Sequence, residues 1–117
     1  MAHRVVLVVD DDPLIRMGFQ GALEAEGFQV VEAEDAYEAL RALAELTAIE
    51  TMICDVAMPG MDGLELARLA AAQRPKLRII IVSGHADALD SRITNRVQFM
   101  RKPFPLLPFA QWLRQSA

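Results

Sequence analysis

Short apolar runs and amphipathic segments alternate along this chain of 117 residues, with little space between them. Each apolar run is strand-sized, and the runs "VVLVV" and "IIIV" are apolar at every position, which is typical of strands buried on both faces of a sheet. The run "FQVVEA" is more amphipathic and predicts a strand with one exposed face. The five predicted strands cover residues 4–10, 28–33, 51–55, 77–84 and 97–100.

Helical periodicity fills most of the intervals between these strands. Pro13 has the fixed φ of a first helical turn, and Gly27 ends that helix. The second predicted helix has an apolar face made of Tyr37, Leu40, Leu43 and Ala44. Residues 85–95 are polar and weakly periodic, so we expect a short or irregular helix there. The other helices are predicted at residues 13–26, 36–46, 64–73 and 105–115.

Strands that alternate with helices over short connections predict an α/β fold with a parallel sheet, because right-handed crossovers place helices on both faces. The length, together with 53% hydrophobic residues, suits one domain over residues 1–117. Ligands of such folds bind beyond the carboxyl ends of the strands, where the strand order reverses. A functional site is therefore expected at that edge of the sheet.

Composition and charge argue against several other classes of protein. The apolar runs fall far below the roughly 20 residues of a membrane span, and the opening "MAHR" lacks the apolar stretch of a signal peptide. We therefore expect a cytoplasmic protein. Cys54 is the single cysteine, which excludes a disulfide framework within the chain. A net charge of -4 with scattered basic residues argues against nucleic acid as a direct partner.

Polar side chains stand at the carboxyl ends of four of the predicted strands. They are Asp10 and Asp11 after the first strand, Asp55 after the third, Ser83 after the fourth and Lys102 after the fifth. Because the carboxyl ends of parallel strands meet at one edge, these side chains are expected to lie together. The adjacent carboxylates of "VVDDDP" repel one another unless a cation, solvent or a helix N-terminus compensates them.

This predicted group has the chemistry of a phosphoryl-transfer site. Its carboxylates are hard oxygen ligands, too few for a closed cage, which suits an Mg²⁺ ion that keeps waters and takes a phosphate oxygen. The hydroxyl of Ser83 and the ammonium of Lys102 are suitable donors to phosphoryl oxygens. An aspartate can itself attack phosphorus and form an acyl phosphate. The residues therefore predict transfer of a phosphoryl group to a carboxylate.

Four motifs, "VLVVDDDP", "CDVAMPGMDG", "IIIVSG" and "RKPF", follow one another in an order that resembles the receiver domains of two-component response regulators. The resemblance covers essentially the whole chain. It implies a flavodoxin-like (βα)5 doubly wound parallel sheet with the strand order 2-1-3-4-5. Both a chemotaxis-type single-domain receiver and a terminal receiver of a hybrid kinase fit this pattern.

The resemblance also implies a role for each acidic residue. Asp55 takes the position of the phosphoacceptor. Asp10 and Asp11 belong to the acidic site for Mg²⁺, or Mn²⁺ in its place, to which Asp55 also contributes. Ala57 is expected to supply a backbone carbonyl to the same metal ion. Asp12 is left as a solvated residue at the start of a helix.

Three further positions are implied to sense the phosphoryl group. Ser83 takes the hydroxyl position and Lys102 that of the phosphate-pairing lysine, followed by Pro103 in a Lys-Pro step that is often cis in this family. Phe99 takes the position of the aromatic switch residue. The interval from Ser83 to Lys102 is shorter than in most receivers, and "ITNRVQF" replaces the familiar Ala-Gly-Ala turn, so a shortened or irregular fourth helix is expected.

The leading interpretation is a phosphoacceptor in a two-component phosphorelay that takes a phosphoryl group from a histidine kinase or a phosphotransfer protein, changes conformation and signals to a protein partner. Such a domain promotes its own phosphotransfer and dephosphorylation without being an enzyme acting on other substrates. It is expected to be a monomer or weak dimer. Two alternatives remain open: an Mg²⁺-dependent phosphohydrolase with an aspartyl-phosphate intermediate, and an interaction module that works without phosphorylation.

Overall fold

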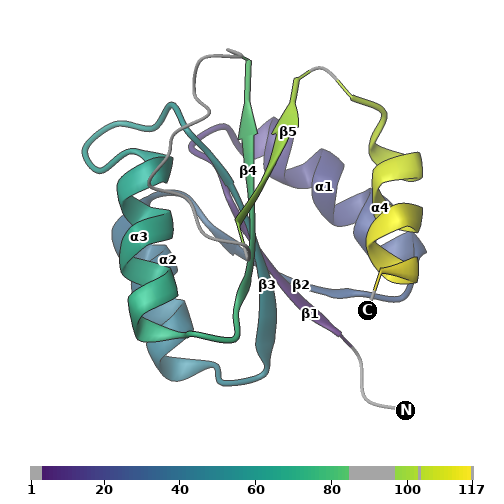
Figure 1. The fold of residues 1–117 in the computed structure, drawn as a ribbon. Coiled ribbons are helices and arrows are strands. Elements are labelled where there is room, and N and C mark those ends of the chain that lie inside the picture. Colours follow the sequence, from purple (N-terminus) through teal and green to yellow (C-terminus); the bar gives the residue numbers. More distant parts are fainter. Residues whose placement is uncertain (1–3, 85–96, 103, 117) are drawn as a thin grey trace.

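In a computed structural model, which describes residues 4–84, 97–102 and 104–116, five parallel strands form one sheet. Their order is β2-β1-β3-β4-β5, which confirms the predicted flavodoxin-like topology (Figure 1). The strands are β1 (Val5–Val9), β2 (Gln29–Ala33), β3 (Ile49–Asp55), β4 (Arg78–Ser83) and β5 (Val97–Arg101).

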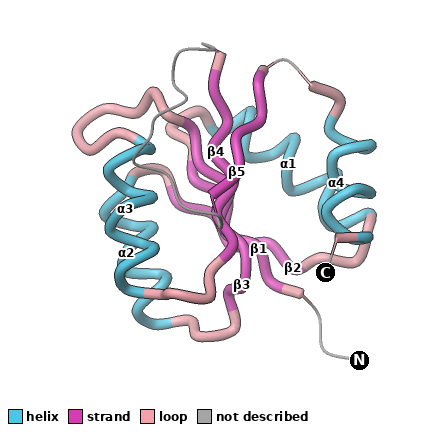
Figure 2. Tube along the Cα trace, in the orientation of Figure 1, coloured by secondary structure: helices cyan, strands magenta, loops and turns pink. Residues whose placement is uncertain are grey.

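The helices lie in two layers, with α2 and α3 on one face of the sheet and α1 and α4 on the other (Figure 2). They are α1 (Pro13–Ala25), α2 (Ala36–Glu45), α3 (Gly63–Gln73) and α4 (Leu106–Gln115). None of these helices is long and apolar enough to cross a membrane. The short or irregular helix expected within residues 85–95 falls outside the described residues.

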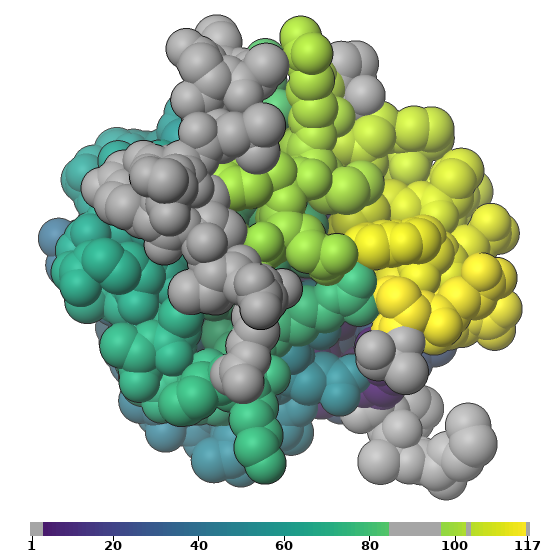
Figure 3. Space-filling view, in the orientation of Figure 1, coloured from purple at the N-terminus to yellow at the C-terminus, as the bar shows by residue number. Residues whose placement is uncertain are grey.

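Successive residues of the central strands face opposite layers, which divides the core in two. Leu7 of β1 and Ile81 of β4 pack toward α2 and α3, whereas Val8 and Ile80 pack toward α1 and α4. All four are at most 1% exposed, which explains why these strands are apolar at every position. The two edge strands are only partly buried, and β5 lies at the surface in Figure 3.

The predicted apolar face of α2 is partly wrong. Tyr37 is 64% exposed, and Ala44 also faces solvent. The face that is fully buried consists of Ala36, Ala39 and Leu43. These positions are spaced by three and four residues, and two of them are alanines, so the helix backbone can lie close to the sheet. Tyr37 is one position further round the helix and is therefore carried away from the core.

Strand β3 begins two residues earlier than predicted, at Ile49. Ile49 pairs with Val5, but the next pair joins Val6 to Thr51, so the register shifts at Glu50. Such a bulge leaves one residue of the strand without a partner in the ladder. Ile49 is nevertheless 1% exposed, and its burial accounts for the longer strand.

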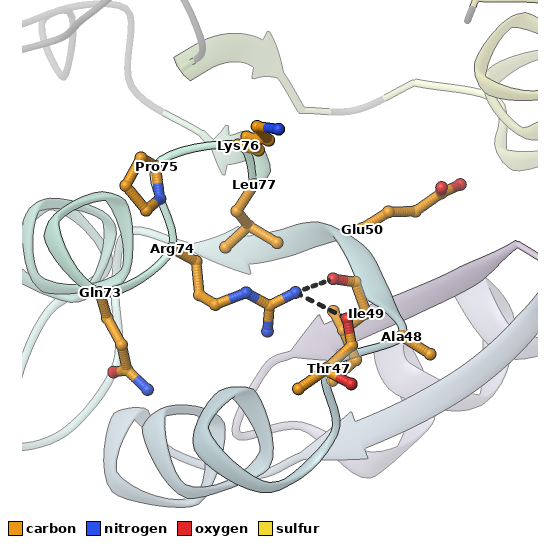
Figure 4. Close-up of a pocket in the computed structure, with 9 residues that line it drawn as sticks. All are labelled: Thr47, Ala48, Ile49, Glu50, Gln73, Arg74, Pro75, Lys76 and Leu77. Carbon is orange, nitrogen blue, oxygen red and sulfur yellow. Dashed lines mark hydrogen bonds between the residues drawn. The ribbon is translucent and has the colours of Figure 1, made fainter.

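At the opposite edge from the predicted site, Arg74 joins the end of α3 to the segment between α2 and β3 (Figure 4). Its guanidinium donates to the backbone carbonyls of Leu43 at 3.0 Å, Thr47 at 3.1 Å and Ile49 at 2.5 Å. The carbonyl of Leu43 belongs to the last turn of α2, where helical acceptors lack partners. Arg74 therefore caps one helix while it fixes the start of β3.

Replacing Arg74 with Ala is expected to lower the free energy of unfolding by about 2 kcal/mol, because two partly buried carbonyls lose a charged donor. Urea unfolding followed by the fluorescence of Trp112 measures this change. Arg68→Ala is the matched control, since Arg68 is exposed and pairs with Glu65 one turn away on the same helix. Equal losses in the two variants would contradict the bridging role.

Candidate functional site

All the predicted site residues that terminate strands lie at the carboxyl edge of the sheet. Asp10 follows β1, Asp55 ends β3, and Ser83 ends β4. Lys102 follows β5, and its backbone N–H donates to the carbonyl of Ser83 at 2.7 Å. The parallel register places Asp55 opposite Val82 and Ser83 opposite Arg101, so neighbouring strands end almost level.

Three carboxylates converge at this edge. Oxygens of Asp10, Asp11 and Asp55 lie within 4.8 Å of one another, with Asp10 3% exposed, Asp55 half-buried and Asp11 open to solvent. Hard oxygen donors from one buried, one intermediate and one exposed carboxylate fit an Mg²⁺ ion that keeps several waters. The backbone N–H of Ala57 donates to Asp55 Oδ1 at 3.2 Å, which places this loop beside the acidic group.

Asp10 is held in its place at an electrostatic cost. Burial raises the pKa of its carboxyl group, and the charges of Asp55 and Asp11 raise it further. The backbone N–H of Asp12, which donates to Asp10 Oδ1 at 2.9 Å, and the charge of Lys102 act in the opposite direction. Burial prevails, so the site favours a proton or a cation on this carboxylate.

The third acid of "VVDDDP" has a different position. Asp12 is the N-cap of α1, and its Oδ1 accepts a hydrogen bond from the backbone N–H of Leu14 at 2.9 Å. Its side chain is exposed. This confirms the prediction of a solvated residue at a helix start, and it explains how three consecutive carboxylates are accommodated.

Lys102 supplies the positive charge of the site. Its Nζ lies 3.0 Å from Oδ2 of Asp55, and both side chains are largely shielded from solvent. Ser83 is 5% exposed beside this pair of strand ends. Phe99 is half-buried and packs against the core on the α2 and α3 side of the sheet. Pro103, and with it the expected cis peptide, lies outside the described residues.

Gly63, which lies one residue before the predicted start of the third helix, supports the end of β3. It is the first residue of α3, and its backbone N–H donates to the carbonyl of Val56 at 3.0 Å. A Cβ atom at this position would overlap the backbone carbonyl of Asp55. The available sequence signal was a glycine directly after Asp62, the N-cap of α3. Its absent side chain lets the helix abut the proposed phosphoacceptor.

Two other groups of reactive side chains have structural explanations. Burial raises the pKa of the Cys54 thiol to about 12, so it stays protonated and unreactive. Glu34, Asp35 and Glu38 form a second acidic cluster at the start of α2. There the N–H of Glu38 donates to Oδ1 of the N-cap Asp35 at 2.8 Å, and the N–H of Glu34 donates to Glu38 Oε1 at 3.2 Å, so these carboxylates hold the start of the helix.

The doubly wound α/β fold carries three carboxylates, a hydroxyl and a paired lysine at the carboxyl edge of its sheet, which is where ligands of such folds bind. The model of the response regulator receiver domain family matches residues 6–108. The chain therefore belongs to the response regulator receiver domain family, a family of signalling domains in two-component systems.

The relatives include both kinases and transcription regulators. The chain is 35% identical over 114 residues to the sensor kinase CckA of Brucella abortus and 41% identical over 115 residues to the C4-dicarboxylate transport transcriptional regulatory protein DctD of Rhizobium meliloti. These matches cover 94% and 95% of this chain but only 12% and 25% of the relatives. A response regulator receiver protein from Pseudomonas putida has 33% identity and a TM-score of 0.88, with 99% of both chains covered.

Replacing Asp10 with Asn is expected to stabilise the metal-free protein at neutral pH by about 1 kcal/mol, because it removes a buried charge. An acid whose pKa is raised by folding loses stability as the pH rises through that pKa. The advantage of the variant should therefore shrink at acidic pH, where Asp10 itself is neutral. Urea unfolding in the presence of chelator, from neutral to acidic pH, measures this difference in stability. A variant that is less stable than the wild type at neutral pH would contradict the raised pKa of Asp10.

Replacing Gly63 with Ala is expected to cost about 2 kcal/mol, because the added methyl group forces the backbone of Asp55 to move. Gly21→Ala on α1 is the matched control. A Cβ at Gly21 meets nothing within 4 Å, so that change should stabilise the helix by about 1 kcal/mol. Thermal unfolding of the two variants tests the contrast, and opposite signs are expected.

Proposed function

We propose that this chain accepts a phosphoryl group on Asp55 from a phosphohistidine of a histidine kinase or a phosphotransfer protein. The observation that supports this most directly is the 3.0 Å pair of Lys102 Nζ and Asp55 Oδ2 beside two further carboxylates. In the proposed step a carboxylate oxygen of Asp55 attacks phosphorus and the P–N bond to the histidine breaks. The electron pair stays on the imidazole nitrogen, and an acyl phosphate forms.

Asp55 is oriented for this step through both oxygens. Ala57 donates its N–H to Oδ1, and Lys102 holds Oδ2. The ammonium group of Lys102 can therefore shift from the carboxylate of Asp55 to the phosphoryl oxygens as the O–P bond forms. Catalysis then consists of positioning and charge neutralisation.

The metal site in this proposal uses Asp10, Asp11 and Asp55, with the backbone carbonyl of Ala57 as a further ligand. The carboxylate set and the raised pKa of Asp10 fit a divalent cation. Mg²⁺, or Mn²⁺ in its place, would supply positive charge to the crowded carboxylates and to a phosphoryl oxygen.

Ser83 and Lys102 are the proposed sensors of the phosphoryl group. Both stand at strand ends joined by the hydrogen bond from Lys102 N to the Ser83 carbonyl, so contacts to one phosphoryl group can draw β4 and β5 together. Phe99 lies on β5, within the same element. A conformational switch requires that these contacts differ between the two states, and we assign that difference to this pair of strand ends.

Exposed apolar side chains beside the site support a protein as the phosphodonor. Leu14 and Met17, on the first turns of α1, are 72% and 62% exposed, and Leu107 at the start of α4 is 54% exposed. Large apolar side chains in such positions favour burial against another protein. The proposed protein is a cytoplasmic monomer or weak dimer with one receiver domain over residues 1–117, and its downstream target is a protein.

Incubation with acetyl phosphate and Mg²⁺ is expected to add one phosphoryl group to the intact protein, as seen by mass spectrometry. The Asp55→Asn variant should remain unmodified, because an amide is not a nucleophile toward phosphorus. Excess chelator should also prevent the reaction. Asp62→Asn is the matched control, since Asp62 caps α3 and lies outside the acidic group.

The same experiment separates the alternatives. Normal modification of Asp55→Asn would overturn the proposed acceptor. Sustained release of phosphate from small esters, with turnover, would favour a phosphohydrolase. A protein that gains no adduct from acetyl phosphate or from a phosphorylated histidine domain, and releases no phosphate, would be an interaction module.

A further inference from the structure

Arg16 connects α1 to the loop after β1 and to β2. It lies on α1, with a side chain 15% exposed. Its Nη1 donates to the backbone carbonyl of Asp10 at 2.5 Å, and its Nε lies 3.1 Å from Oε1 of Glu32 on β2. One guanidinium therefore joins the loop after β1 to a neighbouring strand.

The bond to the Asp10 carbonyl restrains the backbone that carries two of the three clustered carboxylates. That carbonyl belongs to the peptide between Asp10 and Asp11, so fixing it fixes the direction in which the chain continues to Asp11. On the other side, the N–H of Asp10 donates to the carbonyl of Ala33 at 3.2 Å. The backbone of Asp10 is thereby tied to β2 directly and, through Arg16 and Glu32, a second time.

The fork of Arg16 suits this task better than a lysine would. A planar guanidinium can hold two acceptors at fixed angles, whereas an ammonium is a single flexible point charge. The carboxylate of Glu32 balances the guanidinium charge, so the pair adds little net field at the acidic cluster. The contribution of the Arg16–Glu32 pair is to restrain the backbone at Asp10.

We propose that Arg16, oriented by Glu32, is a positioning residue that holds the Asp10–Asp11 peptide in the conformation required for divalent-metal binding. This inference rests on the proposed function, because it assigns Asp10 and Asp11 to the metal. It predicts that losing Arg16 weakens the metal affinity and leaves the phosphoryl transfer step intact once the metal is saturating.

The test is an Mg²⁺ titration followed by backbone amide NMR shifts, with the Mg²⁺ dependence of the initial acetyl phosphate reaction as a second readout. Arg16→Met is expected to raise the dissociation constant for Mg²⁺ about tenfold, with a rate at saturating Mg²⁺ close to that of the wild type. If Arg16 acted only through its charge, Arg16→Met would lower the dissociation constant for Mg²⁺, because the loss of a nearby positive charge favours binding of a cation. An unchanged or lower dissociation constant would overturn the proposal.

Arg114→Met is the matched control, since Arg114 pairs with Glu26 at 3.1 Å and its loss changes the net charge equally. Arg16→Lys decides the question if Arg16→Met does not fold. It keeps the charge but loses the fork, so a dissociation constant above the wild-type value supports positioning and an equal one overturns it. Absence of any Mg²⁺-dependent shift in the wild type would instead refute the proposed function.

Discussion

Oxygens of Asp10, Asp11 and Asp55 approach within 4.8 Å of one another at the end of a sheet whose interior is apolar. Three carboxylates at this distance repel one another, and contacts from the surrounding residues reduce that repulsion. Lys102 reaches Asp55 from β5, and the Asp12 amide donates to Asp10. These contacts only partly offset the burial of Asp10, whose pKa stays raised. Without a cation, the charged carboxylates therefore destabilise this edge of the sheet, and binding of a cation or a proton would reduce that cost.

Such a site needs a rigid frame, because repelling groups otherwise move apart. The frame is the pair of central strands, buried on both faces, from which Asp10 and Asp55 extend. Gly63 lets α3 abut the backbone of Asp55, and Arg16 ties the carbonyl of Asp10. In each case the backbone is held, which leaves the carboxylate oxygens available for chemistry.

The sequence was sufficient for the helix layers and for the edge where the candidate site lies, because these follow from apolar runs and from polar residues close to strand ends. The strand order came instead from the resemblance to receiver domains. It was less informative where a side chain contacts a distant backbone. Arg16 and Arg74 both donate to carbonyls, and a carbonyl is present in every residue, so no residue pattern identifies the acceptor. Tyr37 was misplaced for a related reason: alanines define the buried face of α2, and they are weaker markers of burial than an aromatic ring.

The strands that carry the site residues differ in how firmly the sheet holds them. Asp10 and Asp55 extend from strands with a neighbour on either side, and displacing them would disrupt both core layers. Strand β5 has β4 as its single neighbour in the sheet and is only partly buried. Lys102 directly follows this strand and contacts Asp55. A change in charge at Asp55 is therefore expected to act first on β5, which is less buried than β1 and β3. In the proposed function, β5 is therefore the strand through which a change at Asp55 would reach the surface.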